Sequence, residues 1–288
     1  MSAYRFCRTD DIGLLVNALN RCWSPYFPDE PPMTPEAFKR SIRDLQVWCS
    51  SCMVAFSGSD PVGVLIGAKR PSGTLVHKIA VHPDHRRQGH GRHLLASLGS
   101  KLAILGPPRI VAEVPDALDA ACGLFCASGF TQEALLTDYV LERKDCDARD
   151  VAEGFVIPIT VDDLAANGLF DGAHPPACWE RSVETLTARK GEIVGRAVAS
   201  DERIEAYLLY VKCGVDPDGI AAIVSLRTFI EDGGARLGQL LVPLLGRGIG
   251  TFLFPKVHPA EISEELLETL GFHPAGGHVL YAARARSE

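Results

Sequence analysis

The sequence has no apolar run long enough to cross a bilayer. Its longest apolar stretches, such as residues 240–245, fall far short of the roughly 20 residues that a membrane-spanning helix needs. It also lacks a basic excess, because 36 acidic residues stand against 29 Lys and Arg and the formal net charge is −7. We therefore expect no membrane association and no nucleic-acid partner, since a general binder of nucleic acid or of an anionic membrane needs a basic face.

The N-terminus has no basic segment followed by an apolar block, so it does not resemble a secretory signal. Nine cysteines are an odd number, and a chain of 288 residues with 47% hydrophobic residues can bury a core without disulfides. Cys49 and Cys52 form a Cys-x-x-Cys pair, which supplies only half of a zinc site, and their apolar surroundings favour buried thiols. These features predict a reducing, cytoplasmic location and no metal.

The chain contains a weak internal repeat. Gly129-Phe130 recurs as Gly271-Phe272, each time after a strand and a helical run. Near the start of each half, Arg8-Thr-Asp-Asp-Ile resembles Thr160-Val-Asp-Asp-Leu. Two matches in the same order predict two domains of related fold.

Turn residues, prolines and leucine spacing give the first half strands and helices in mixed order. Two expected helices begin after Asp10 and at Pro35, and two more span residues 89–104 and 116–128. The expected strands span residues 4–7, 52–56, 62–68, 74–81, 110–114 and 139–141. This order predicts an α+β fold, with domains at residues 1–146 and 154–288 joined by an acidic linker within 144–153.

Residues 76–93 differ in charge from the rest of this acidic chain. Lys78, Arg86, Arg87 and Arg92 stand against Asp84 alone. Gly89 and Gly91 precede or open a helix and permit close approach of a ligand to the backbone. The first amides of a helix and nearby arginines bind phosphate well, so an anionic ligand with adjacent phosphates is expected here.

Two other glycine motifs do not fit this segment. A Walker loop needs Gly-Lys-Ser/Thr, and a dinucleotide fingerprint needs a small residue where Leu94 stands. The pattern Arg86-x-x-Gly89-x-Gly91, which follows a strand ending in Val81-His82-Pro83, resembles the acyl-CoA pyrophosphate loop of the GNAT superfamily of N-acetyltransferases.

The resemblance implies that each half has a mixed, splayed sheet, in which the strand before the loop separates from its neighbour. It also implies that acetyl-CoA is the co-substrate. Backbone groups of Ile79, Ala80 and Val81 would hold the pantetheine arm and the thioester carbonyl. The pyrophosphate would lie on the loop formed by Arg86, Arg87, Gln88, Gly89, His90, Gly91 and Arg92. The implied acceptor is a primary amine of a small molecule or peptide, and the implied assembly is a monomer with an intrachain pseudo-dimer, or a homodimer.

The second half has no matching loop. When Gly271 is aligned with Gly129 and no gap is allowed, Thr228 replaces Arg86 and Glu231 replaces Gly89. Because a carboxylate there would repel phosphate, we expect a degenerate GNAT-like domain without CoA, with CoA binding through an altered loop as the alternative.

Acetyl transfer to an amine requires a base and a proton for the leaving thiolate. His77 lies nine residues before Arg86, where some family members have a catalytic glutamate, although a strand histidine can also simply bond a carbonyl. Glu113 is the second candidate base, acting through water.

The general acid is less clear from the sequence. Many family members have a tyrosine four residues before the Gly-Phe pair, and Phe125 stands there. Tyr139, Cys126 or water would then supply the proton, or the thiolate leaves unassisted. The same substitution leaves open a non-catalytic acyl-CoA-binding regulatory or scaffold protein.

Two residue clusters have open interpretations. His82, His85, His90 and His93 crowd the loop, and phosphate contacts or exposure are favoured over a metal site. Trp23, Tyr26 and Phe27 either line an acceptor pocket or pack the core, and the core is favoured.

Overall fold

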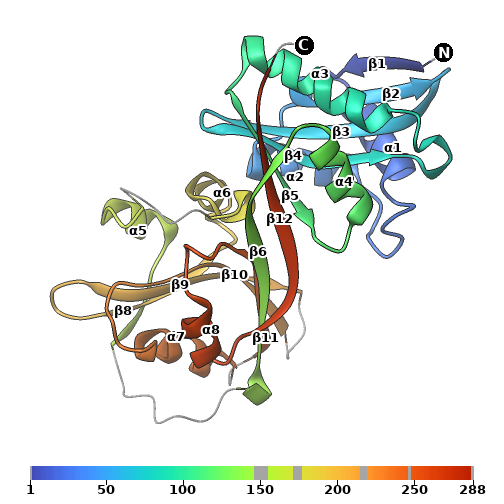
Figure 1. Cartoon of the computed structure of the whole chain (residues 1–288). Coiled ribbons are helices and arrows are strands. Elements are labelled where there is room, and N and C mark those ends of the chain that lie inside the picture. The colour runs from blue at the N-terminus through green and yellow to red at the C-terminus, as the bar shows by residue number, and fades with distance from the viewer. Residues whose placement is uncertain (1, 146–154, 171–176, 215–218, 246–247, 287–288) are drawn as a thin grey trace. The chain divides into compact units, whose positions relative to one another are not determined.

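The computed structural model describes residues 2–145, 155–170, 177–214, 219–245 and 248–286. Two compact units make up the chain (Figure 1). The first unit comprises residues 1–133 and 279–288, and the second comprises residues 134–278. Each unit is a mixed sheet flanked by helices, which confirms the predicted α+β class.

In the first unit, four antiparallel strands are followed by a fifth that is parallel to the fourth, and then by the last part of β12. Its sheet order is β1-β2-β3-β4-β5-β12, and β5 runs parallel to β4. The strands are β1 (Ser2–Phe6), β2 (Met53–Ser57), β3 (Asp60–Arg70), β4 (Gly73–Val81), β5 (Arg109–Pro115) and β12 (His273–Arg284). The helices are α1 (Ile12–Cys22), α2 (Pro35–Leu45), α3 (His90–Leu105) and α4 (Asp119–Ala127).

Local sequence explains where these helices lie. Thr34 caps α2, because its hydroxyl accepts a hydrogen bond from the Ala37 amide at 3.1 Å, and Pro35 occupies the first helical position. In α3, Leu94, Leu98 and Leu102 recur at helical spacing and are buried against the sheet, in the cluster that also holds residues of β5 and α4. Each such leucine contributes about 1.5–3 kcal/mol through burial, so α3 is held firmly behind the loop that precedes it.

The second unit repeats this pattern with shorter helices. Its sheet order is β12-β6-β11-β10-β9-β8-β7. The strands are β6 (Thr131–Glu142), β7 (Val156–Pro158), β8 (Val194–Ala199), β9 (Ile204–Cys213), β10 (Gly219–Thr228) and β11 (Ile249–Val257). The helices are α5 (Val161–Ala166), α6 (Val183–Ala188), α7 (Ala235–Leu245) and α8 (Glu264–Thr269), with a 3-10 turn, η4, at Trp179–Arg181.

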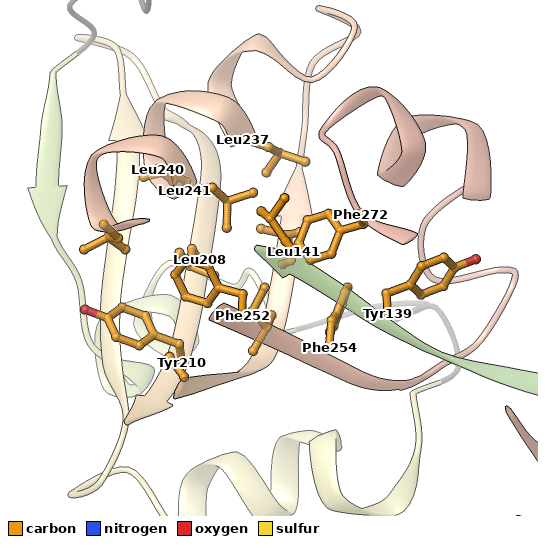
Figure 2. Packing of buried hydrophobic residues seen from close by; sticks show 14 of the residues in the cluster. Tyr139, Leu141, Leu208, Tyr210, Leu237, Leu240, Leu241, Phe252, Phe254 and Phe272 are labelled. Atoms are coloured by element: carbon orange, nitrogen blue, oxygen red, sulfur yellow. The ribbon is translucent and has the colours of Figure 1, made fainter. Parts of the chain in front are cut away.

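One core cluster of the second unit lies between its sheet and the helices α7 and α8 (Figure 2), and another contains residues of α5, α6 and the strands β8 to β10. Leu237, Leu240 and Leu241 of α7 meet Phe252 and Phe254 of β11 there, and all five are almost fully buried. Among the described residues, no helix is both long and apolar enough to span a membrane.

The last strand of each repeat belongs to the other repeat's unit. From Ala134 on, β6 lies in the second unit, where it runs antiparallel to β11. From Val279 on, β12 lies in the first unit, next to β5. The predicted division at 1–146 and 154–288 follows the repeat in the sequence, whereas the compact units follow this exchange. Residues 146–153 of the predicted linker lie outside the described residues.

Candidate functional site

The two central strands of the first unit separate partway along their length. β4 and β5 pair only at Thr74 with Ile110 and at Leu75 with Val111. Beyond these two pairs, no further β4–β5 pair occurs in the described part of the chain. The sheet therefore has the predicted splay, and Ile79, Ala80 and Val81 lie on its β4 side.

A β-bulge places His77 at the start of the splay. In the pairing of β3 with β4, Gly67 opposes Val76 and Ile66 opposes Lys78, so His77 is the extra residue. A bulge turns a side chain away from the regular alternation of the strand. Gly67 is required opposite this bulge, because a Cβ there would lie 2.5 Å from the carbonyl oxygen of Ser51.

The loop between β4 and α3 presents backbone amides to an open space. Arg87 and Gly89 have left-handed φ values of 61° and 86°, and Gly89 is the N-cap of α3 without a side-chain cap. Within the described chain, the amides of residues 87–92 donate no hydrogen bond. No heavy atom lies within 4 Å of the position that a Cβ on Gly89 would occupy. A helix start with unpaired amides and free space is suited to bind an anion.

Two residues predicted for this loop have a further structural role. A Cβ on Gly91 would lie 3.0 Å from the Leu124 side chain, so this glycine permits α3 to pack on α4 and does not widen the loop. The His90 side chain is buried, and its Nδ1 shares a hydrogen bond with the Tyr4 hydroxyl at 2.7 Å. Burial, helped by His85 and His93, lowers the pKa of His90. Both residues can therefore offer a ligand their amides only.

Arg86 is held at the end of β4 by Tyr26. Its Nε donates to the Tyr26 hydroxyl at 2.5 Å, and its guanidinium lies 4.3 Å from the Tyr26 ring. The same hydroxyl donates to the carbonyl oxygen of Val81 at 2.5 Å. The guanidinium is thereby fixed beside the loop, and Arg86 is exposed, as are Arg87, Gln88 and Arg92.

The aromatic residues after α1 do not belong to the core, contrary to the expectation from the sequence. Trp23, Tyr26 and Phe27 are half-buried. Trp23 stacks on Phe27 with ring centres 4.5 Å apart, and the Lys78 ammonium lies 3.8 Å from the centre of the Trp23 ring. The Nε1 of Trp23 donates to Glu30 at 3.0 Å. This cluster forms a partly exposed surface beside β4.

The predicted catalytic residues do not all lie in the first unit. Glu113 is half-buried on β5, two residues beyond the last pair with β4. Tyr139 is only 5% exposed and packs in the core of the second unit with Leu141 and Phe254 (Figure 2). Tyr139 is thus not brought to the splay of the first unit, because this part of β6 belongs to the second unit.

Strand exchange brings a different tyrosine to the first unit. Tyr281 of β12 is the counterpart of Tyr139 in the alignment that places Gly271 on Gly129. Its ring stacks on Phe125 at 5.8 Å, and the Cys126 thiol donates to its hydroxyl at 3.7 Å. Burial, followed by contacts with Cys126 and Cys122, raises the pKa of Tyr281. The repeat is the signal that could have found this residue.

In the second unit two neighbouring strands also separate, but one of the unit's own side chains occupies the helix start that follows. Pairing of β10 with β11 ends at Ala222 with Leu253. Gly234 precedes α7 with φ 86°, the same conformation as Gly89, so these two glycines are the equivalent positions. Glu231 then stands at the position of Arg86, where the ungapped alignment placed Thr228. Asp232 stands at the position of Arg87.

The carboxylate of Asp232 occupies the start of α7. It accepts hydrogen bonds from the amides of Gly234 at 3.0 Å and Arg236 at 2.7 Å. These amides correspond to those that the first unit leaves open. An internal carboxylate therefore takes the place that an external anion would occupy.

Among the described residues, no group of three or more His, Cys, Asp or Glu side chains is placed to hold a metal ion. The rings of His82 and His85 lie 6.0 Å apart and those of His85 and His90 lie 6.5 Å apart.

Comparison with known proteins gives one family and one fold. Residues 14–130 match the model of the acetyltransferase (GNAT) family. No curated protein matches the chain. Among solved structures, a tandem GNAT protein from the clavulanic acid biosynthesis pathway is 19% identical over 100% of both chains, with a TM-score of 0.67.

Two further solved structures also match nearly the whole chain. A GCN5-related N-acetyltransferase from Sphaerobacter thermophilus is 14% identical over 99% of this chain and 96% of its own, with a TM-score of 0.65. A putative acetyltransferase from Pyrococcus horikoshii is 16% identical over 100% and 90%, with a TM-score of 0.60. At these identities the likeness establishes the fold.

The cap on α7 generates a stability prediction. Asp232→Ala removes the acceptor of two helix-start amides and should lower the free energy of unfolding by about 1 kcal/mol, within the range of roughly 0.5–2 kcal/mol for lost caps. Urea unfolding followed by circular dichroism measures it. Asp201→Ala, an exposed residue of the same unit, is the control. Equal stability of the two variants would show that Asp232 does not cap α7.

Proposed function

The chain belongs to the GNAT acetyltransferase family through residues 14–130, and from this premise we propose that it transfers an acetyl group from acetyl-CoA to a primary amine of a small molecule or peptide. One observation carries the proposal. The first unit joins a splayed strand pair to a helix start whose amides are unpaired within the described chain, and the second unit does not.

The residues of the first unit fit an acyl-CoA. Amides of residues 87–92, the positive end of the α3 dipole and the exposed guanidiniums of Arg87 and Arg92 would hold the pyrophosphate. The open space at Gly89 admits phosphate oxygens close to the backbone. The β4 edge at Ile79 and Ala80, left without a β5 partner, would hold the pantetheine arm by backbone hydrogen bonds.

Direct attack places distinct demands on the residues around the splay. The amine must lose a proton and attack the thioester carbon; the carbon–sulfur bond then breaks and the thiolate takes up a proton. His77, re-aimed by the bulge, would accept the first proton, with Glu113 acting through water as the alternative. Amides near Ala80 and Val81 would stabilise the oxyanion.

We assign the general acid to Tyr281. Its ring stacks on Phe125, the position where many family members have a tyrosine, and its hydroxyl lies beside Cys126 of α4. The family's proton donor on α4 is thus replaced by one on β12. The exposed Cys126 thiol, which donates to this phenol, would return a proton to the phenolate and then take one up from water.

The setting of the reaction is also part of the proposal. All cysteines in the described part of the chain are free thiols, which supports a reducing, cytoplasmic location. The cluster of Trp23, Phe27 and Glu30 beside β4 is where the acceptor amine would approach. The Lys78 ammonium already lies over Trp23 and 3.6 Å from Glu30, so the cluster would contact the acceptor mainly through its aromatic faces. Two units in one chain support a monomer with an intrachain pseudo-dimer.

The loop 86–92 is tested by a charge placed in it. Gly89→Glu should abolish CoA binding in isothermal titration calorimetry, together with amine-dependent release of CoA thiol, because a carboxylate would fill the space of the phosphates. Gly89→Ala carries the same backbone strain without the charge and should still bind. Arg86→Ala should weaken binding by about 1–3 kcal/mol. CoA affinity retained in Gly89→Glu would show that the coenzyme binds elsewhere.

The base is tested by the pH dependence of the rate. His77→Gln should reduce kcat about 100-fold and remove the rise of kcat with increasing pH that loss of a proton from the base produces. Glu113→Gln is the matched variant on the opposite side of the splay and should keep that rise. If Glu113→Gln shows the larger loss instead, the assignment of the base is reversed.

The two repeat-related tyrosines separate the candidates for the acid. Tyr281→Phe should lower kcat about tenfold or more with little change in KM, because only the proton donor is lost. Tyr139→Phe removes the same hydroxyl from the core of the second unit and should keep kcat within about twofold. Thermal melts of both variants control for folding. The opposite order of effects would return the role to Tyr139.

A further inference from the structure

The second unit contains a cavity that the proposed acetyl transfer does not use. Its volume is about 210 Å³, and it lies between η4 and α6 on one side and β9 and β10 on the other. Every lining residue belongs to the second unit: Phe170, Ala177, Arg181, Ser182, Val183, Glu184, Leu186, Tyr207, Ser225, Leu226, Arg227 and Glu261. Cavities that hold drug-sized ligands have about 300–1,000 Å³, so a smaller molecule is expected here.

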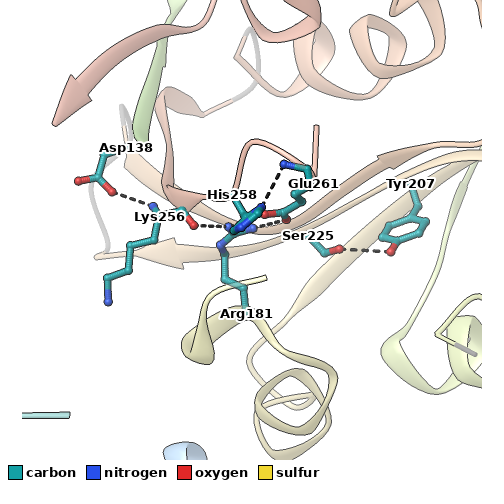
Figure 3. A network of polar contacts seen from close by, with 8 residues as sticks. Asp138, Arg181, Tyr207, Ser225, Lys256, His258 and Glu261 are labelled. Carbon is teal, nitrogen blue, oxygen red and sulfur yellow. Dashed lines mark hydrogen bonds and ion pairs between the residues drawn. The ribbon is translucent and has the colours of Figure 1, made fainter. Parts of the chain in front are cut away.

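One end of the cavity is built around a fixed, buried cation. The Arg181 side chain is 2% exposed, and its two terminal nitrogens donate to the two carboxylate oxygens of Glu261 at 2.5 and 2.7 Å. It also donates to the carbonyl oxygen of Lys256 at 2.8 Å (Figure 3). The amide of Lys256 is itself bonded to Asp138 at 2.7 Å. The guanidinium therefore has a single position.

This cation retains one donor for a ligand. The Nε–H of Arg181 is buried and meets no oxygen or nitrogen acceptor in the described chain; the side chain of Cys178 is its partner, through a hydrogen bond and an electrostatic contact. Sulfur is a weak acceptor, so an oxygen acceptor on a bound molecule would satisfy this donor better than the thiol does. Arg181 and Glu261 neutralise each other's charge, so at this end Arg181 contributes the position of its donors and the net positive charge must come from another residue.

A second cation and two hydroxyls lie on the strands. Arg227 is half-buried on β10, 5.2 Å from the Phe229 ring and in contact with the phenol of Tyr207. Ser225 donates to that phenol at 3.2 Å. Glu184, which is the remaining acid of the lining, is exposed. The polar end of the lining therefore favours an anion over a cation.

The other walls are apolar. They are formed by side chains from the start of the unit, from α6 and from β10: Phe170, Ala177, Val183, Leu186 and Leu226. A cationic end and apolar walls fit a molecule with an anionic head and a compact hydrocarbon body. We propose that this cavity binds a small carboxylic acid of this kind, of the size of benzoate, with its carboxylate at the end formed by Arg181 and Arg227 and its body against the apolar walls.

The site is independent of the coenzyme. It lies in the unit whose helix start is closed by Asp232, and no residue of the loop 86–92 lines it. A carboxylic acid bound there would stabilise the second unit by mass action, whether or not the first unit is occupied. Failure of CoA binding in the first unit would leave this inference untouched.

The test uses a pair of probes that share a body and differ in the charge of the head. Ligand-observed NMR on the full chain should show saturable binding of benzoate and none of benzylamine. Arg227→Gln should weaken benzoate binding at least about tenfold. Arg189→Gln, which alters a surface arginine paired with Glu192 in the same unit, should leave it unchanged. Excess CoA should not displace benzoate.

A second variant keeps the test decisive if Arg227→Gln fails to fold. Val183→Phe fills the cavity from α6 without touching a charge and should abolish benzoate binding while the thermal melt stays cooperative. Equal binding of benzoate and benzylamine would overturn the proposal, as would undiminished benzoate binding in Val183→Phe. Displacement of benzoate by CoA would also overturn it, because it would place the probe in the first unit.

Discussion

The amides at the start of a helix need an acceptor, and the two units of this chain meet that need in opposite ways. In the second unit, Asp232 supplies an internal carboxylate to the amides of Gly234 and Arg236. In the first unit, the amides of residues 87–92 have no acceptor within the described chain. One unit therefore caps its own helix start, while the other has open amides that an external phosphate would satisfy. The rest of the proposed chemistry depends on this difference, because the coenzyme's position determines which side chains can act on its thioester.

The exchange of the last strands determines which side chains those are. It removes Tyr139 from the first unit and supplies Tyr281, which occupies the equivalent place in the other repeat. It also makes the hydrophobic core of the first unit depend on residues near the end of the chain, since Val279 and Tyr281 are buried among residues of β2 to β5. The first unit can be complete only after nearly the whole chain is available.

The sequence predicted the local features well and the long-range ones less well. Helix starts with a cap or a proline, such as Thr34-Pro35, and the turn before α3 carry their information within a few residues. The two glycines show the limit. Their spacing identified the loop, but the contact of Gly91 with Leu124 depends on how α4 packs, which no local pattern contains. The strand exchange was likewise invisible, because a strand's sequence gives its two faces and not its neighbours. The ungapped alignment of the second loop differs from the structure, in which Gly234, just before α7, has the conformation of Gly89; the sequence allowed a gap that reaches Gly234 but could not choose it over the ungapped register.

The buried pair of Arg181 and Glu261 is difficult to explain by stability alone. Taking two charges out of water costs several kcal/mol per ion, and a well-packed apolar pair of similar volume is often as stable or more so. What such a pair supplies is position: both terminal nitrogens and both oxygens are engaged, so the guanidinium cannot turn. A cation held rigidly at the wall of a cavity, with one donor that meets no oxygen acceptor in the described chain, suits the recognition of an anionic group. The second unit, whose phosphate loop is closed, thus retains the kind of polar arrangement that binding requires and that core packing does not.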